Sequence, residues 1–141
     1  MVKYFFLSIS FLTIAAPSYG GPPSDNYGQG LDLLKQAAGQ LVLAQSLTAD
    51  PDSWYYDPAV VALVDAIAAA ENATANGVRG GVAKKNADFA ASNALAAALI
   101  AHYLHSVETN PDAAAYWLEA SNSALQGAIL LDRSISREWP H

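Results

Sequence analysis

The chain has 141 residues, no cysteine and a formal net charge of −6, with 13 acidic residues against 7 lysines and arginines. The absence of cysteine excludes a disulfide framework, a thiolate metal site and covalent haem attachment. The acidic balance leaves no basic patch for a phosphate backbone, so neither nucleic acid nor an anionic membrane surface is an expected partner.

The first twenty residues, MVKYFFLSISFLTIAAPSYG, have the three parts of a secretory signal peptide. Lys3 supplies the positive start, Tyr4 to Ala16 form the apolar run, and Ser18 and Gly20 are the small residues before the cut. The run is shorter than the about 20 apolar residues that cross a bilayer. We therefore expect cleavage after Gly20 and an exported protein, periplasmic or secreted, with no stable membrane insertion afterwards. An uncleaved N-terminal anchor is the alternative.

The mature chain is then residues 21–141, long enough for one domain with a modest core. Removing residues 1–20 takes away one lysine and no acidic residue, which moves the net charge from −6 to −7. The alanine-rich composition favours helices, and no stretch alternates as a strand would. Residues 21–27, GPPSDNY, are expected to be an extended leader because of their prolines and glycine.

The first predicted helix covers residues 28–48. Its apolar residues recur at three- and four-residue spacing, which is one face of a helix. They are Leu31, Leu34, Ala37, Ala38, Leu41 and Ala44.

The second predicted helix covers residues 58–76, after the loop TADPDSWYYDP. Asp57 is a suitable N-cap, Pro58 suits the first turn, and Gly77 is a natural C-terminal stop. Its predicted apolar stripe contains Val60, Leu63, Val64, Ile67, Ala70 and Thr74.

The third predicted helix covers residues 82–108, after the break GVRGG. Its larger apolar residues share one face centred on Phe89, which we expect to face the core. This face contains Val82, Phe89, Asn93, Ala96, Ile100, Tyr103 and Val107. The opposite side carries alanines, and it is expected to pack on a neighbouring helix or on a second copy of the protein.

The fourth predicted helix covers residues 111–136, with Asn110 as its N-cap and Pro111 in its first turn. Its stripe contains Ala113, Trp117, Ala120, Ala124, Ala128, Leu131 and Ile135. The apolar pattern fades after Ser136, which leaves residues 137–141 as a tail.

Four amphipathic helices with short loops predict an all-α fold, an antiparallel up-down four-helix bundle spanning residues 28–136. In that topology the loops after the first and third helices lie at the same end of the bundle. Aromatic and histidine side chains then gather there, as is typical of recognition surfaces. The predicted contact surface contains Trp54, Tyr55, Tyr56, His102, Tyr103, His105, Tyr116 and Trp117. In the alternative, Trp54 and Trp117 merely plug the open end of the bundle and the tyrosines lie at its rim.

His102, His105 and Glu108 near the end of the third helix also permit a second hypothesis, a transition-metal or haem site. Two histidines three apart can chelate a metal, but a useful site needs further ligands. Here the histidines lie nearly opposite the Phe89 stripe, whereas metal sites in bundles use residues that project inward. Histidine near a helix C-terminus is also favoured by the helix dipole without any ligand.

No nucleophile–base pairing, phosphate loop or calcium loop is present, so no catalytic residue and no cofactor are assigned. The leading hypothesis is an exported, non-catalytic helical protein that acts through contact with a protein partner or with itself. A metal- or haem-binding bundle that uses His102 and His105 is the alternative function.

Overall fold

The computed structural model describes the backbone of residues 22–135 and the side chains from Asn26 onward. Over this range it contains four helices and no strand: α2 (Pro22–Leu47), α3 (Tyr56–Thr74), α4 (Gly80–Val107) and α5 (Pro111–Leu131). The all-α prediction is therefore confirmed for this part of the chain. The predicted signal peptide and the tail lie outside the described residues.

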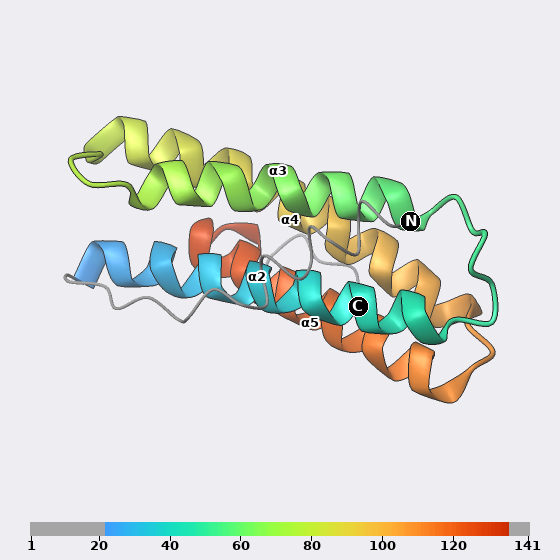
Figure 1. The fold of residues 1–141 in the computed structure, drawn as a ribbon. Helices are drawn as coiled ribbons and strands as arrows, with labels where there is room; N and C mark the ends of the chain where they lie inside the picture. Colours follow the sequence, from blue (N-terminus) through green and yellow to red (C-terminus); the bar gives the residue numbers. More distant parts are fainter. Residues whose placement is uncertain (1–21, 136–141) are drawn as a thin grey trace.

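The four helices pack side by side as a bundle, and successive helices run in opposite directions (Figure 1). Helix α2 packs against α5 and α3, and α4 packs against α3 and α5. Helices α2 and α4 scarcely touch, which places them diagonally across the bundle. The loop between α2 and α3 and the loop between α4 and α5 therefore lie at one end, as expected; we call this the loop end (Figure 1). The α3–α4 turn lies at the opposite end, the turn end.

Helix α2 begins at Pro22, six residues before the predicted start at Gly28. The prediction of an extended leader over 21–27 is therefore wrong from Pro22 onward. Proline is well tolerated in a first helical turn, where its missing N–H would have had no partner within the helix. Tyr27 also packs against the core, so tertiary contact supports this early turn.

The other helix ends follow local sequence signals to different degrees. Asn110 caps α5 as predicted, because its Oδ1 accepts hydrogen bonds from the backbone N–H groups of Asp112 at 2.9 Å and Ala113 at 3.1 Å. Asp57 does not cap α3, which already begins at Tyr56. Helix α5 ends at Leu131 rather than at 136, and the chain turns at Asp132.

The predicted inward faces of α2 and α5 are confirmed. Every residue of both stripes is buried: Leu31, Leu34, Ala37, Ala38, Leu41 and Ala44 on α2, and Ala113, Trp117, Ala120, Ala124, Ala128 and Leu131 on α5, with Ile135 just beyond it. On α3, Leu63 and Ile67 are buried and Val64 is partly buried against the core. On these helices the large apolar side chains and the alanines share one face, so both hydrophobicity and small size indicate that this face is buried.

The predicted inward face of α4 is wrong. Its buried residues are all alanine except one: Ala83, Ala87, Ala90, Ala91, Ala94, Ala97, Ala98, Ala101 and Leu104. The larger residues that were expected inside lie on the outer side, where Val82 is 63% exposed and Phe89 is 58% exposed. Tyr103 and Val107 are exposed on the same side.

The reason is geometric. Helix α4 packs against both α3 and α5, and small side chains let helix axes approach closely on two sides at once. The buried Ser121 hydroxyl donates a hydrogen bond of 2.8 Å to the Ala98 carbonyl, which shows how near the α5 side chains come to the α4 backbone. The alanine side was thus a packing surface for neighbouring helices, one of the two expectations for it.

Helices α2 and α5 approach most closely at a pair of glycines. A Cβ atom on Gly127 would lie 2.7 Å from Leu34 Cδ2 and 3.0 Å from the Gly30 carbonyl oxygen. A Cβ atom on Gly30 would lie 2.9 Å from Leu131 Cγ. Any larger residue at either position would push the two helices apart.

Candidate functional site

The loop end is organised around the carboxylate of Glu108, which directly follows α4. One oxygen, Oε1, accepts hydrogen bonds from the Thr48 hydroxyl and from the indole Nε1 of Trp117, the latter at 2.8 Å. The other oxygen, Oε2, accepts from the backbone N–H groups of Ala49 at 3.0 Å and Asn110 at 3.1 Å. Glu108 therefore joins both loops of this end to α5.

These bonds change the acidity of Glu108. Partial burial by itself would raise its pKa, but the donors from Thr48, Ala49, Trp117 and Asn110 stabilise the carboxylate and together lower the pKa to about 2. The group is thus a structural anion at neutral pH rather than a proton donor. This makes Glu108 a poor candidate for general acid–base catalysis.

Two of the aromatic residues predicted for the contact surface belong to the core. Trp117 is 1% exposed and Tyr56 is 2% exposed, and their rings meet edge to face with centroids 6.2 Å apart. Neither ring can meet a partner while the bundle is folded. Of the two tryptophans expected as plugs in the alternative, Trp117 does fill the end of the bundle, whereas Trp54 is exposed; Tyr56 lies in the core and not at the rim.

Three other predicted residues form an exposed stack, which we call the aromatic stack: Trp54, Tyr55 and Tyr103. The rings of Trp54 and Tyr55 stack with centroids 4.0 Å apart, and Tyr55 lies 4.7 Å from Tyr103 of α4. Trp54 is 69% exposed and Tyr103 is 44% exposed. The stack thus presents a large, ordered aromatic surface that spans two segments of the chain.

A cleft of about 360 Å³ lies beside the aromatic stack. Tyr103, Val107 and Glu108 line it from α4 and its C-terminal end, and Asp50 lines it from the α2–α3 loop. Residues 36–78 and 86–132 contain no lysine or arginine, so the segments that form this end carry acidic residues without either of these basic ones. The cleft is therefore lined by aromatic, aliphatic and acidic side chains.

The two histidines are placed differently from each other. His102 is exposed, whereas His105 is half-buried and its Nδ1 lies 2.8 Å from the Ala114 carbonyl oxygen. Since a carbonyl oxygen can only accept, Nδ1 bears a hydrogen and donates a hydrogen bond to the Ala114 carbonyl on α5. The ring centroids of His102 and His105 are 6.3 Å apart. Tyr116, on α5, is half-buried and packs against the core.

The structure gives the metal hypothesis little support. Within the described residues, no group of three or more His, Asp or Glu side chains is arranged to hold a metal ion. Both oxygens of Glu108 already accept protein hydrogen bonds, and one nitrogen of His105 is engaged with α5. A metal at His102 and His105 would therefore have to displace existing bonds or take its other ligands from solvent.

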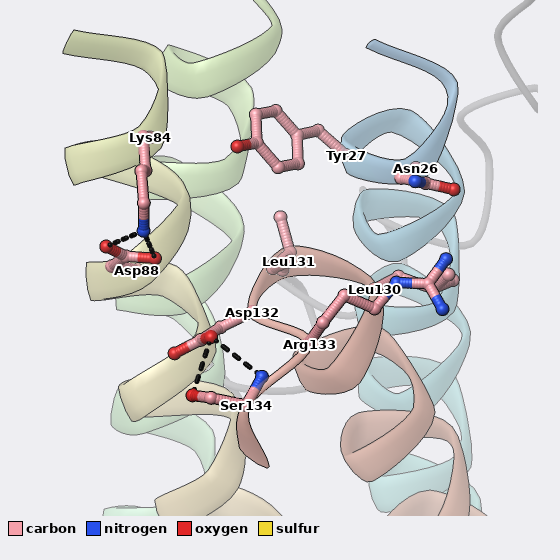
Figure 2. Close-up of a pocket in the computed structure, with 9 residues that line it drawn as sticks. All are labelled: Asn26, Tyr27, Lys84, Asp88, Leu130, Leu131, Asp132, Arg133 and Ser134. Atoms are coloured by element: carbon pink, nitrogen blue, oxygen red, sulfur yellow. Dashed lines mark hydrogen bonds and ion pairs between the residues drawn. The ribbon is translucent and has the colours of Figure 1, made fainter. Parts of the chain in front are cut away.

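The turn end carries a second cleft, of about 410 Å³, between α2, α4 and the C-terminal end of α5 (Figure 2). Its basic group Lys84 lies 2.9 Å from Asp88 in an exposed ion pair, which raises the pKa of Lys84. Arg133 points away from this pair in the same view (Figure 2). Asp132 instead accepts hydrogen bonds from the backbone and hydroxyl of Ser134. Of the polar groups that line this cleft, Lys84 already pairs with Asp88 and Asp132 with Ser134, which makes this cleft a weaker candidate site.

Sequence reasoning found the aromatic residues of the loop end but missed the role of Thr48 and the structural role of Glu108. Thr48 lies 60 residues from Glu108, and no local pattern connects the two. A signal did exist for one contact. Glu108 precedes the capping residue Asn110 by two positions and accepts a hydrogen bond from its backbone N–H, and acidic side chains commonly bond backbone groups at such short separations.

Comparisons of the chain with protein-family models, with curated proteins and with solved structures found no match. None of the helices within the described residues is long and apolar enough to cross a membrane.

Proposed function

We propose that this protein is exported and acts without catalysis, through contact between its exposed aromatic surface and another protein molecule. The observation that carries the proposal is the aromatic stack: Trp54 is 69% exposed yet packed against Tyr55, which in turn packs against Tyr103. Rings held in this way offer apolar contact area at little further entropic cost on binding.

The surroundings of the stack support a binding role over a purely structural one. Trp117 and Tyr56 already fill the core at this end and Tyr55 packs partly against it, whereas Trp54 and Tyr103 remain exposed outside it. The Glu108 network fixes the loop that carries them, through Thr48 and Ala49. A preorganised loop loses less conformational entropy when a partner binds.

The export part of the proposal rests on the signal-peptide pattern of residues 1–20. Intact-mass measurement of the chain expressed with its own N-terminus tests it, since cleavage after Gly20 leaves Gly21 as the first residue. A full-length chain retained in the cytoplasm would contradict export and leave the contact proposal to be judged separately.

The contact proposal is tested by cross-linking and co-purification from the envelope fraction, together with size-exclusion chromatography and light scattering of the pure chain. We expect Trp54→Ala to reduce complex formation at least about tenfold, as for a central aromatic contact. The matched control is Leu118→Ala, an exposed apolar residue on α5 away from the stack. A strict monomer that captures no partner and is indifferent to Trp54→Ala would contradict the proposal.

A further inference from the structure

The outer face of α4 exposes more large apolar side chains than any other described helix does. Exposed large apolar side chains occur on every helix, but α4 alone carries five of them along one side. They are Val82, Phe89, Leu99, Tyr103 and Val107. Between Asp88 and Glu108 this helix contains no Asp, Glu, Lys or Arg. A helix face of this kind is typical of a surface that packs against another helix.

The spacing on this face is that of a helix-pairing seam. Val82, Phe89, Ala96 and Tyr103 follow one another at intervals of seven residues, and Asn86, Asn93, Ile100 and Val107 form a parallel row four residues on. Both asparagines turn their Nδ2 groups back onto α4, to the carbonyls of Val82 and Phe89 at 3.0 Å. Covering the face therefore leaves these two amide nitrogens with their hydrogen bonds.

The charges at the two ends of the bundle indicate what covers this face. The loop end carries Asp50, Asp52, Asp57, Glu108 and Asp112, with no lysine or arginine in residues 48–57 or 108–112. The turn end carries Arg79, Lys84, Lys85 and Arg133 beside Glu71, Asp88 and Asp132. A second copy laid antiparallel along α4 brings the basic residues of each molecule toward the acidic end of the other. A parallel copy would bring two acidic ends together.

We propose that the outer face of α4 pairs with the same face of a second copy of this chain, with the two helices antiparallel and crossing near Ala96. This inference rests on the proposed contact function and names its partner. Ala96 is the centre because Phe89 and Tyr103 each lie seven residues from it, so each Phe89 meets the Tyr103 of the other copy. The small side chains of Ser92 and Ala96 let the two axes approach at the crossing.

The same symmetry extends the interface to both ends. Lys85 and Val107 are each eleven residues from Ala96 and therefore lie opposite one another across the two-fold axis. Asp50 lines the same cleft as Tyr103 and Val107. Lys85 of the other copy, which lies opposite Val107, therefore comes close to Asp50. Trp54 and Tyr55, stacked beside Tyr103, then enlarge the contact around Phe89 of the second molecule.

The first experiment is sedimentation equilibrium of the purified chain at several concentrations and salt levels. We expect a dimer whose dissociation constant rises with ionic strength, since salt screens the contact between the opposite ends. Phe89→Ser should raise that constant at least about tenfold, because Phe89 is a central aromatic contact. Leu118→Ser on α5 is the matched control and should leave it unchanged. Circular dichroism checks that both variants are folded.

A charge exchange tests the antiparallel arrangement directly. Lys85→Glu or Asp50→Lys alone should weaken the homodimer by roughly three- to tenfold, because each puts like charges opposite one another twice. An equimolar mixture of the two variants should recover the native affinity as a heterodimer, since both contacts then pair opposite charges. Weakening without recovery in the mixture would overturn the arrangement.

Engineered cysteines give an independent geometric check, because the chain has none of its own. Mixed Lys85→Cys and Val107→Cys chains should form a disulfide heterodimer under mild oxidation, whereas a parallel dimer would link like positions. Gln126→Cys, exposed on α5, is the control that should not cross-link.

The outcomes separate this inference from the contact function on which it rests. A monomer at all concentrations that still captures a different partner through Trp54 would overturn the dimer and leave the contact function standing. A monomer that captures nothing, whatever residue stands at position 54, would overturn both.

Discussion

The two ends of the bundle are closed by opposite means. At the loop end, large side chains and a carboxylate close the structure: Trp117 fills the core, and Glu108 holds the two loops and α5 together. At the turn end the closure depends on missing side chains, because Gly30 and Gly127 let α2 and α5 touch backbone to backbone. The charged groups there form an exposed ion pair instead of a shielded network.

The exposed aromatic residues of the loop end are therefore free to serve another purpose. Because Trp117 and Glu108 stabilise the loop end from within, Trp54 and Tyr103 are available for contact without a cost to the fold. Helix α4 is divided in a similar way: its alanines pack in the core, and Phe89 and Val82 are exposed on its outer face. Stability and the proposed contact function thus fall to different residues of the same segments.

The strongest test of this contrast replaces the two tryptophans of the loop end in turn. Trp117→Ala removes a fully buried ring and an indole donor to Glu108, and we expect it to cost about 3–5 kcal/mol of unfolding free energy. Trp54→Ala removes an exposed ring and should change stability by no more than about 0.5 kcal/mol. Urea unfolding followed by circular dichroism measures both. Equal losses would refute the division into a plug and a contact surface.

The next test removes the charge of the loop-end network. Glu108→Gln should cost about 2 kcal/mol at pH 7, because a neutral amide accepts these hydrogen bonds less strongly and sets its own N–H groups against the donors. Glu119→Gln on the exposed side of α5 is the control and should be nearly neutral.

The same variant predicts a pH dependence. The pKa of Glu108 is about 2 in the folded protein, below the value of about 4.3 for an unfolded glutamate, so the folded state favours the carboxylate. The stabilisation is complete above about pH 5 and is lost as the pH falls from there toward 2. Urea unfolding between pH 7 and pH 2.5 should show the native protein and Glu108→Gln converging. A gap that stays constant over this range would contradict the network's role.

The turn end is tested by adding a single methyl group. Gly127→Ala should cost about 1–3 kcal/mol, since the new Cβ would lie 3.0 Å from the Gly30 carbonyl and the helices must separate. Gly81→Ala is the control: nothing lies within 4 Å of its Cβ position, and alanine should stabilise the start of α4 by about 0.5 kcal/mol. Thermal unfolding of the two variants should move in opposite directions.

The smallest expected effect concerns the ion pair of the turn end. Lys84 and Asp88 are 69% and 42% exposed, so Lys84→Ala should lower the unfolding free energy only slightly, and less still at high salt. A double-mutant cycle with Asp88→Asn measures the coupling between the two groups. A coupling as large as the effect of Glu108→Gln would remove the contrast between the ends.

Much of the fold was predictable because its signals are local. The Asn110–Pro111 cap, the stop near Gly77 and the inward stripes of α2 and α5 all depend on residues within a few turns of one another. The early start of α2 was not predictable in this way, since the helix gains support there from packing of Tyr27 on the core. For the site, sequence reasoning named Trp54, Tyr55 and Tyr103 and the end of the bundle on which they lie, but not that their rings stack.

By itself, then, the amino-acid sequence determined four amphipathic helices, their order and the end at which the aromatic residues meet. Only the tertiary structure decided which face of α4 is buried and what Glu108 does. Hydrophobicity ranks Phe89 and Val82 as core residues, but a helix packed on two close neighbours selects for small volume, and alanine meets that demand. Glu108 gains its role from Thr48, a residue far along the chain that only the packed bundle brings into contact.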